Sequence, residues 1–157
     1  MTTTKFHPES YTQALKTQSV SYESPSNIAL IKYWGKHGVQ IPKNPSISFT
    51  LNNCKTTTKL SFEKRTNFDE AYDLKVILDG KHKPGFEPKI HQFFGRIDEY
   101  LPFIKEYRFT IDTTNSFPHS SGIASSASGL SALALCLMEM EREMQPEMSL
   151  KHFNQKA

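Results

Sequence analysis

The stretch that decides how this sequence folds is F-P-H-S-S-G-I-A-S-S-A-S-G, residues Phe117–Gly129. The residues before it, Tyr107–Thr114, alternate apolar and polar side chains, which predicts a β-strand. The residues after it, Leu130–Met144, are apolar and rich in Ala, Leu and Met, which predicts a buried helix. The sequence therefore predicts a loop of small residues between a strand and the start of a helix.

A loop of this kind is suited to bind a phosphate. Small side chains let backbone N–H groups approach an anion closely, and a helix N-terminus adds unpaired donors and a partial positive charge. Ser125, Ser126 and Ser128 would add hydroxyl groups. The same letters also fit the start of an ordinary buried helix, because serine is a common N-cap and small residues allow close packing. The stretch is not a Walker loop, since it contains no Gly-Lys pair, and it lacks the G-x-G-x-x-G of dinucleotide-binding loops.

Length and composition fit one folded domain with its own core. The chain has 157 residues, of which 37% are hydrophobic and 22% charged. A net charge of +3 with scattered Lys and Arg gives no sign of a nucleic-acid partner. No apolar run is long enough to cross a membrane, so no membrane partner is expected. The six His residues fall in no ligand spacing, so we predict no metal bound by the protein alone.

The two cysteines indicate a compartment. Cys54 and Cys136 lie far apart, in strand-like or apolar surroundings, and no secretion signal precedes them. We therefore expect reduced, structural thiols and a cytoplasmic location.

The first half of the chain predicts strands. Ser19–Glu23 and Ile28–Trp34 are predicted as two strands, the second buried because it is continuously apolar. Ile47–Leu51 and Thr56–Glu63 alternate, and a turn at Asn52–Asn53 would join them into a hairpin.

The second half adds helices. Leu74–Leu78 predicts a strand that enters a turn at Asp79–Gly80, and Pro88–Leu101 has apolar residues at helical spacing. Ser149 is a candidate N-cap for a last helix. Strands followed by helices, without regular βαβ alternation, indicate the α+β class.

The two ends of the chain carry further expectations. Residues 1–17 are polar and without period, which predicts a loosely held leader before a domain at 18–157. The last helix reaches Ala157 without a terminating Gly or Pro, so we expect that the chain is truncated.

A second segment, P-S-N-I-A-L-I-K-Y-W-G-K at Pro25–Lys36, places two lysines at the end of a strand. Lys32 and Lys36 could supply positive charge to a phosphate, with Tyr33 and Trp34 as apolar walls. The alternative is that both lysines simply reach solvent.

Together, these segments resemble one family. S-N-I-A-L-I-K-Y-W-G-K, then N-P-S-I-S-F-T-L at Asn44–Leu51, then F-P-x-x-S-G-I-A-S-S-A-S-G resemble the diphosphomevalonate decarboxylases of the GHMP kinase superfamily. The resemblance runs from about Ser21 to the end of the chain. It implies an α+β, GHMP-kinase-type amino-terminal domain (ribosomal protein S5 domain 2-like), with a mixed sheet and helices packed on one face.

The resemblance also implies site residues. Lys32 matches a catalytic lysine near the reacting hydroxyl, and Tyr33 and Lys36 match substrate-binding positions. Ser46 and Ser48 are weaker candidates for the wall of the cleft, and Asn27 for a structural hydrogen bond. The residues expected to bind the ATP phosphates are Ser121, Gly122, Ala124, Ser125, Ser126 and Ser128.

The family's reaction explains why such groups are needed. ATP phosphorylates the C3 hydroxyl of mevalonate 5-diphosphate, phosphate and CO2 leave, and isopentenyl diphosphate forms, as part of isoprenoid biosynthesis by the mevalonate pathway. The resemblance therefore implies ATP and Mg²⁺ and mevalonate 5-diphosphate as substrate, and it allows a homodimer. Because these ligands bring much negative charge together, positioning and charge neutralisation carry the catalysis.

Two departures from the family pattern lead to further expectations. His119 is expected to be a tolerated variant at the rim of the loop, or else to touch a phosphate and add a pH dependence. The family's catalytic Asp and a substrate-binding Arg lie beyond the point that matches Ala157. We therefore expect that the carboxy-terminal GHMP domain is absent, that the chain alone is inactive, and that it exposes an apolar face. The alternatives are a sister GHMP small-molecule kinase and a non-catalytic nucleotide-binding fragment.

Overall fold

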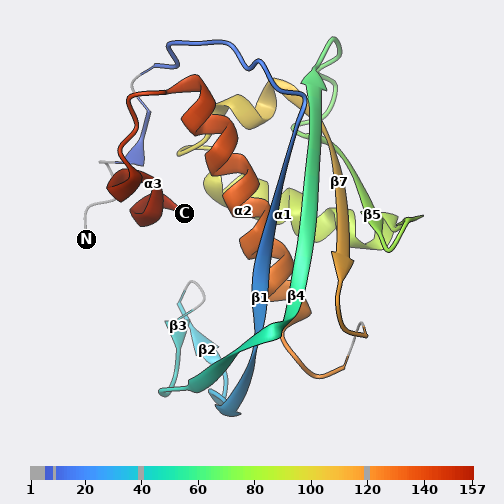
Figure 1. Ribbon diagram of the computed structural model, residues 1–157, viewed down its shortest axis with the longest axis vertical. Coiled ribbons are helices and arrows are strands. Elements are labelled where there is room, and N and C mark those ends of the chain that lie inside the picture. The colour runs from blue at the N-terminus through green and yellow to red at the C-terminus, as the bar shows by residue number, and fades with distance from the viewer. Residues whose placement is uncertain (1–5, 9, 39–40, 119–120) are drawn as a thin grey trace.

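A computed structural model describes residues 6–8, 10–38, 41–118 and 121–157 (Figure 1). It confirms the α+β class, with a five-stranded mixed sheet and a separate two-stranded hairpin. The strands of the sheet are β1 (Ser19–Ile31), β4 (Ile47–Lys64), β5 (Asp73–Leu78), β6 (Lys81–His82) and β7 (Tyr107–Asn115). The hairpin consists of β2 (Lys36–His37) and β3 (Ile41–Pro42). The helices are α1 (Glu87–Ile97), α2 (Ser125–Met144) and α3 (Leu150–Lys156), and two 3₁₀ turns lie at Pro84–Phe86 and Pro102–Lys105.

The order of the strands is β1-β4-β7-β5-β6. β4 pairs antiparallel with both of its neighbours, whereas β5 pairs parallel with β7, and this makes the sheet mixed. The predicted turn after β5 is confirmed: Asp79 and Gly80 have φ of 51° and 73°. Two positive φ angles suit the tight turn that joins β5 to β6.

The core lies between the sheet and the helices α1 and α2. Alternate residues of β4 and β7, among them Leu60 and Phe109, are fully buried against the helices. Phe94 of α1 packs edge to face on Phe109, with ring centroids 5.5 Å apart. Leu133 and Leu137 of α2 complete this layer. The predicted helices at Pro88–Leu101 and Leu130–Met144 are therefore confirmed as core helices, the second beginning five residues earlier than expected.

The first two predicted strands are one strand, and the predicted hairpin of Ile47–Glu63 is wrong. β1 runs through Pro25, which an edge strand tolerates because one side of it needs no hydrogen-bond partner. β4 continues through Asn52–Asn53 and pairs with β1 on both sides of them. Pro25 pairs with Lys55 and Ser26 with Leu51, so residues 52–54 form a bulge with no register partner in β1.

The expectation that Ile28–Trp34 is buried is also wrong. The ribbon of β1 and β4 extends past the start of α2, so none of the helices in the described residues covers its far end (Figure 1). Trp34 is 88% exposed. We call this region the apolar ribbon end; its exposed large apolar side chains are Ile28, Leu30, Ile31, Tyr33, Trp34, Ile41, Ile47 and Phe49.

The amino-terminal segment is held more firmly than expected for a leader. The backbone N–H groups of Thr12 and Gln13 donate to the carbonyl of Met144, and those of Lys16 and Thr17 donate to the side chain of Glu143. The predicted cap of the last helix is confirmed, since the Ser149 hydroxyl accepts the N–H of His152 at 3.1 Å. In the described part of the chain, none of the helices combines the length and the apolar character needed to cross a membrane.

Candidate phosphate and substrate site

The start of α2 is the centre of the candidate site. Its N-cap position is Ala124, which offers no side-chain cap, so the helix begins without the usual hydroxyl or carboxylate acceptor. Gly122 has a φ of 84°, a left-handed conformation that suits glycine. This part of the expected phosphate loop therefore has small side chains and no side-chain cap, while the N–H groups of Ser125 and Ala127 already donate to the carbonyls of Ile123 and Ala124 at 2.8 and 3.1 Å.

One hydrogen bond connects this loop to β1. The N–H of Ala124 donates to the carbonyl of Asn27 at 3.1 Å, so this N–H is engaged within the protein. This bond uses the backbone carbonyl of Asn27, so the structural role expected of the residue itself stays a prediction. Lys32 lies five residues further along the chain, roughly 16 Å away at the rise of an extended strand. The loop and the segment that contains Lys32 are thus connected through β1.

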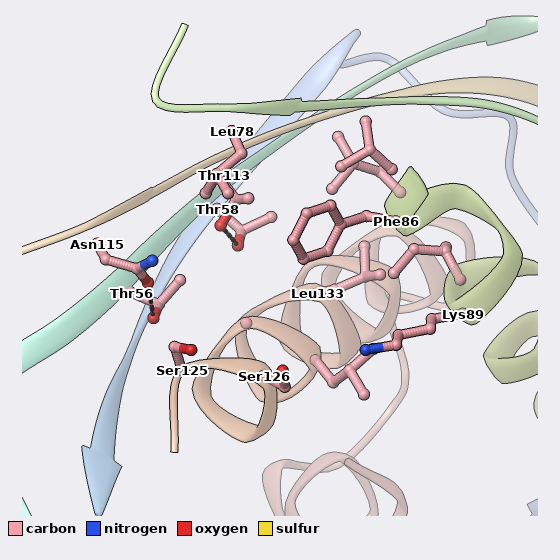
Figure 2. A pocket seen from close by; sticks show the side chains of 15 residues that line it. Thr56, Thr58, Leu78, Phe86, Lys89, Thr113, Asn115, Ser125, Ser126 and Leu133 are labelled. Atoms are coloured by element: carbon pink, nitrogen blue, oxygen red, sulfur yellow. Dashed lines mark hydrogen bonds between the residues drawn. The ribbon is translucent and has the colours of Figure 1, made fainter. Parts of the chain in front are cut away.

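The three serines of the helix start differ in orientation. Ser125 and Ser126 line a cavity in front of the helix (Figure 2). Ser128 is buried, and its hydroxyl lies 2.6 Å from that of Thr56 on β4, which in turn donates to the side-chain oxygen of Asn115 at 2.7 Å. Through these hydrogen bonds, Ser128 connects α2 to the sheet. Its hydroxyl could contact a phosphate only if these bonds broke.

The segment after β1 carries the predicted substrate residues. Asn44 organises it, because its side-chain oxygen accepts the N–H of Trp34 at 2.6 Å and its amide group donates to the carbonyl of Lys32 at 3.5 Å. The ammonium of Lys36 lies 5.5 Å from the centre of the Tyr33 ring, which brings these two predicted residues together. All of these residues except Asn44 are exposed.

The remaining predicted residues take less central places. Ser121 is exposed in the segment before α2, and Ser46 and Ser48 are exposed where β4 begins. Ser48 pairs with Ala29 of β1, so it lies on the same ribbon as the residues that lead to Lys32. His119 lies outside the described residues.

A cavity of about 100 Å³ adjoins the start of α2 and lies between the sheet and α1 (Figure 2). Its lining is mixed: Thr56, Asn115 and Ser125 lie on one side in Figure 2, and Phe86, Leu133 and Lys89 on the other. The polar lining consists of Thr56, Thr58, Thr113, Asn115, Ser125, Ser126 and Lys89. The apolar lining consists of Val76, Leu78, Phe86, Ile90, Ile111, Leu130 and Leu133, and Gly129 also lines the cavity.

The two cysteines are free, and neither lines this cavity. Burial raises the pKa of the Cys136 thiol to about 11. This thiol is therefore protonated and unreactive at neutral pH, as expected of a structural cysteine.

Two residues of the site were not found from the sequence. The sequence motif does not reveal the role of Asn44, although an Asn before a Pro often bonds to neighbouring backbone groups. Lys89 carries no local signal, because only the fold brings α1 to the start of α2.

Comparison with known proteins identifies the family. Residues 24–156 match the diphosphomevalonate decarboxylase-like N-terminal domain, and the chain belongs to this family. The diphosphomevalonate decarboxylase of Rattus norvegicus is 32% identical over 134 residues, which cover 75% of this chain and 32% of the rat protein. The chain thus spans about a third of the length of the curated relatives that it matches.

Solved structures give the same result. The mevalonate diphosphate decarboxylase of Staphylococcus aureus superposes with a TM-score of 0.66 at 31% identity, over 87% of this chain and 39% of that one. A structure from Enterococcus faecalis, described by a mevalonate diphosphate mediated ATP binding mechanism, has a TM-score of 0.60 at 29% identity, over 80% and 42%. A related structure (TM-score 0.59, 29% identity, 80% and 41% covered) is described as MDDEF in complex with MVAPP, AMPPCP and magnesium.

Proposed function

We propose that this chain is the amino-terminal part of an ATP-dependent decarboxylase that converts mevalonate 5-diphosphate into isopentenyl diphosphate. The observation that carries the proposal is the uncapped start of α2, bonded through Ala124 to the strand that leads to Lys32, in a chain of this family. The relatives described with mevalonate diphosphate, an ATP analogue and magnesium support the choice of ligands.

The nucleotide would bind at the start of α2. Ser125 and Ser126 would donate their hydroxyls to the phosphates, with backbone N–H groups near Ser121 and Gly122 beside them. The base would lie at the opening of the adjoining cavity, which at about 100 Å³ is too small to enclose it, with one side of the ring against the apolar lining. Mg²⁺ would arrive with the nucleotide and neutralise part of its charge.

The substrate would bind on the β1 side. Lys32 would offset charge on the phosphoryl group during transfer, while Tyr33 and Lys36 would hold the carboxylate or diphosphate end. The apolar ribbon end, which includes Tyr33 and Trp34, gives a carboxy-terminal domain a place to pack beside this segment. That domain would also supply the catalytic Asp and the Arg that the resemblance places beyond Ala157. A homodimer stays a prediction, and we infer a cytoplasmic location from the free thiols.

Calorimetric titration with MgATP tests the nucleotide site. We expect Ser126→Ala to weaken binding several-fold, because one hydroxyl contact to a charged phosphate is lost. Ser131→Ala is the matched control, since Ser131 is exposed on the same helix and does not line the cavity. Equal affinities of both variants and the unmodified chain would contradict the placement of the phosphates at the start of α2.

Product analysis tests the reaction. Incubated with MgATP and mevalonate 5-diphosphate, the chain alone is expected to bind the ligands without steady release of CO2, since the general base is supplied elsewhere. Sustained ATP-dependent CO2 release would show that this expectation of inactivity is wrong. Accumulation of a phosphorylated product without CO2 would instead favour a sister GHMP kinase.

A further inference from the structure

The candidate nucleotide site lacks a cation of its own. The stretch Phe117–Gly129 contains no Lys or Arg, whereas a Walker loop carries a lysine that neutralises phosphate charge. A helix N-terminus contributes only about half an elementary charge. A nucleoside triphosphate bound there would therefore need positive charge from another element of the fold.

Lys89 of α1 is the cation that lines the same cavity. Figure 2 shows its side chain extending from α1 toward the start of α2, where Ser126 lies. Lys89 is exposed and forms no ion pair with any of the described residues. Several other lysines are paired with carboxylates, for example Lys105 with Asp98 at 2.7 Å. The ammonium of Lys89 is thus available to a ligand at the mouth of the cavity.

We propose that Lys89 binds the phosphate chain of the nucleotide and replaces, from a different helix, the lysine that this loop lacks. This inference rests on the proposed ATP site and adds the residue that neutralises the charge there. An ammonium on a flexible stem can follow a phosphate chain as it leaves the cavity, and it is a common phosphate ligand in proteins. The apolar lining holds the base, while Lys89 and the start of α2 hold the phosphates from two sides.

Titration of the whole chain with MgATP, MgADP and adenosine tests this role. Lys89→Met keeps the length of the side chain and removes its charge, so we expect about a tenfold loss of affinity for ATP and ADP and no change for adenosine. Lys89→Arg should retain most of the affinity, because it keeps the charge. Lys75→Met is the control, since Lys75 is exposed on β5 and does not line the cavity. Circular dichroism melting curves check that every variant is folded.

The outcomes separate the two proposals. If the unmodified chain binds ATP and Lys89→Met binds it equally well, the role of Lys89 is refuted and the proposed function stands. If Lys89→Met weakens ATP and adenosine to the same extent, Lys89 acts on the shape of the cavity, which also refutes a phosphate contact. If the unmodified chain binds none of the three ligands, the nucleotide site itself is refuted, and Lys89 with it.

Discussion

Lys156 and Glu141 form a buried ion pair between α3 and α2, and replacing Lys156 by methionine is expected to destabilise the chain by about 3–5 kcal/mol. The Lys156 ammonium lies 2.6 Å from one carboxylate oxygen of Glu141 and donates to the carbonyl of Tyr100 at 2.9 Å. The two side chains are only 5% and 0% exposed. Water therefore cannot replace either partner when the other is removed.

The magnitude follows from what the substitution leaves behind. Without the Lys156 ammonium, the carboxyl of Glu141 keeps the buried hydroxyl of Tyr11 as its polar neighbour among the described residues, and no positive charge. Burial already raises the pKa of Glu141, and the loss of Lys156 would raise this pKa further. The loss in the free energy of unfolding comes from leaving the buried Glu141 charge unpaired or from protonating it. The double variant Glu141→Leu/Lys156→Met removes both charges and should lie near the unmodified chain or be up to about 4 kcal/mol more stable.

Urea unfolding followed by circular dichroism gives the free energy of unfolding of each variant. Lys151→Met is the matched control, because Lys151 is exposed on the same helix. A loss of less than about 1 kcal/mol for Lys156→Met would refute the reasoning, as this is the value of an exposed pair. The reasoning would also fail if the double variant lost as much stability as the sum of the single variants.

Four further changes test other parts of the structure. Lys105 lies 2.7 Å from Asp98 and holds the pKa of that carboxyl below its usual value. This pair therefore stabilises the fold above about pH 4, and its contribution is lost as pH falls through the lowered pKa. Asp98→Asn should make stability less dependent on pH at the acid end of a curve measured from pH 2 to 7. Ser149→Ala removes the cap of α3 and should cost about 1 kcal/mol in urea unfolding. Ser26→Ala should leave stability unchanged or raise it by about 1 kcal/mol, because the Ser26 hydroxyl is buried without a partner among the described residues; a clear loss would reveal one. Phe49→Ser should reduce binding of a hydrophobic dye and self-association measured by light scattering, and unchanged values would show that the apolar ribbon end is not responsible.

The unit of strand, loop and helix around α2 could be predicted because its signals are local. β7 alternates, the loop is made of small residues, and α2 is a run of strong helix formers. The burial of Ser128 could also have been predicted from the sequence. It lies four residues before Ala132 and eight before Cys136, on the stripe of α2 that is buried.

The ribbon of β1 and β4 could not be predicted, because local signals contradict the pairing that decides it. Pro25 and Asn52–Asn53 each indicate the end of a strand, yet both lie within long strands. Pairing between distant segments outweighs such local preferences. The exposure of Ile28–Trp34 depends on where α2 begins, and Lys89 reaches the cavity from a helix that precedes the loop by about twenty residues. No pattern within a single segment contains this information.

The number of residues in the bulge at Asn52–Cys54 determines which face of the ribbon carries its apolar side chains. Paired residues of two antiparallel strands share a face, so Leu51 faces the same side as its partner Ser26, and Phe49 follows two residues away. Three extra residues are an odd number, and an odd number inverts the alternation of the strand beyond them. If a deletion here shifts the pairing beyond the bulge by one residue, every pair of the ribbon end changes, and Thr50 takes the place of Phe49 opposite Ile28. A family comparison of this region should therefore count whether insertions are odd or even before it compares residue types.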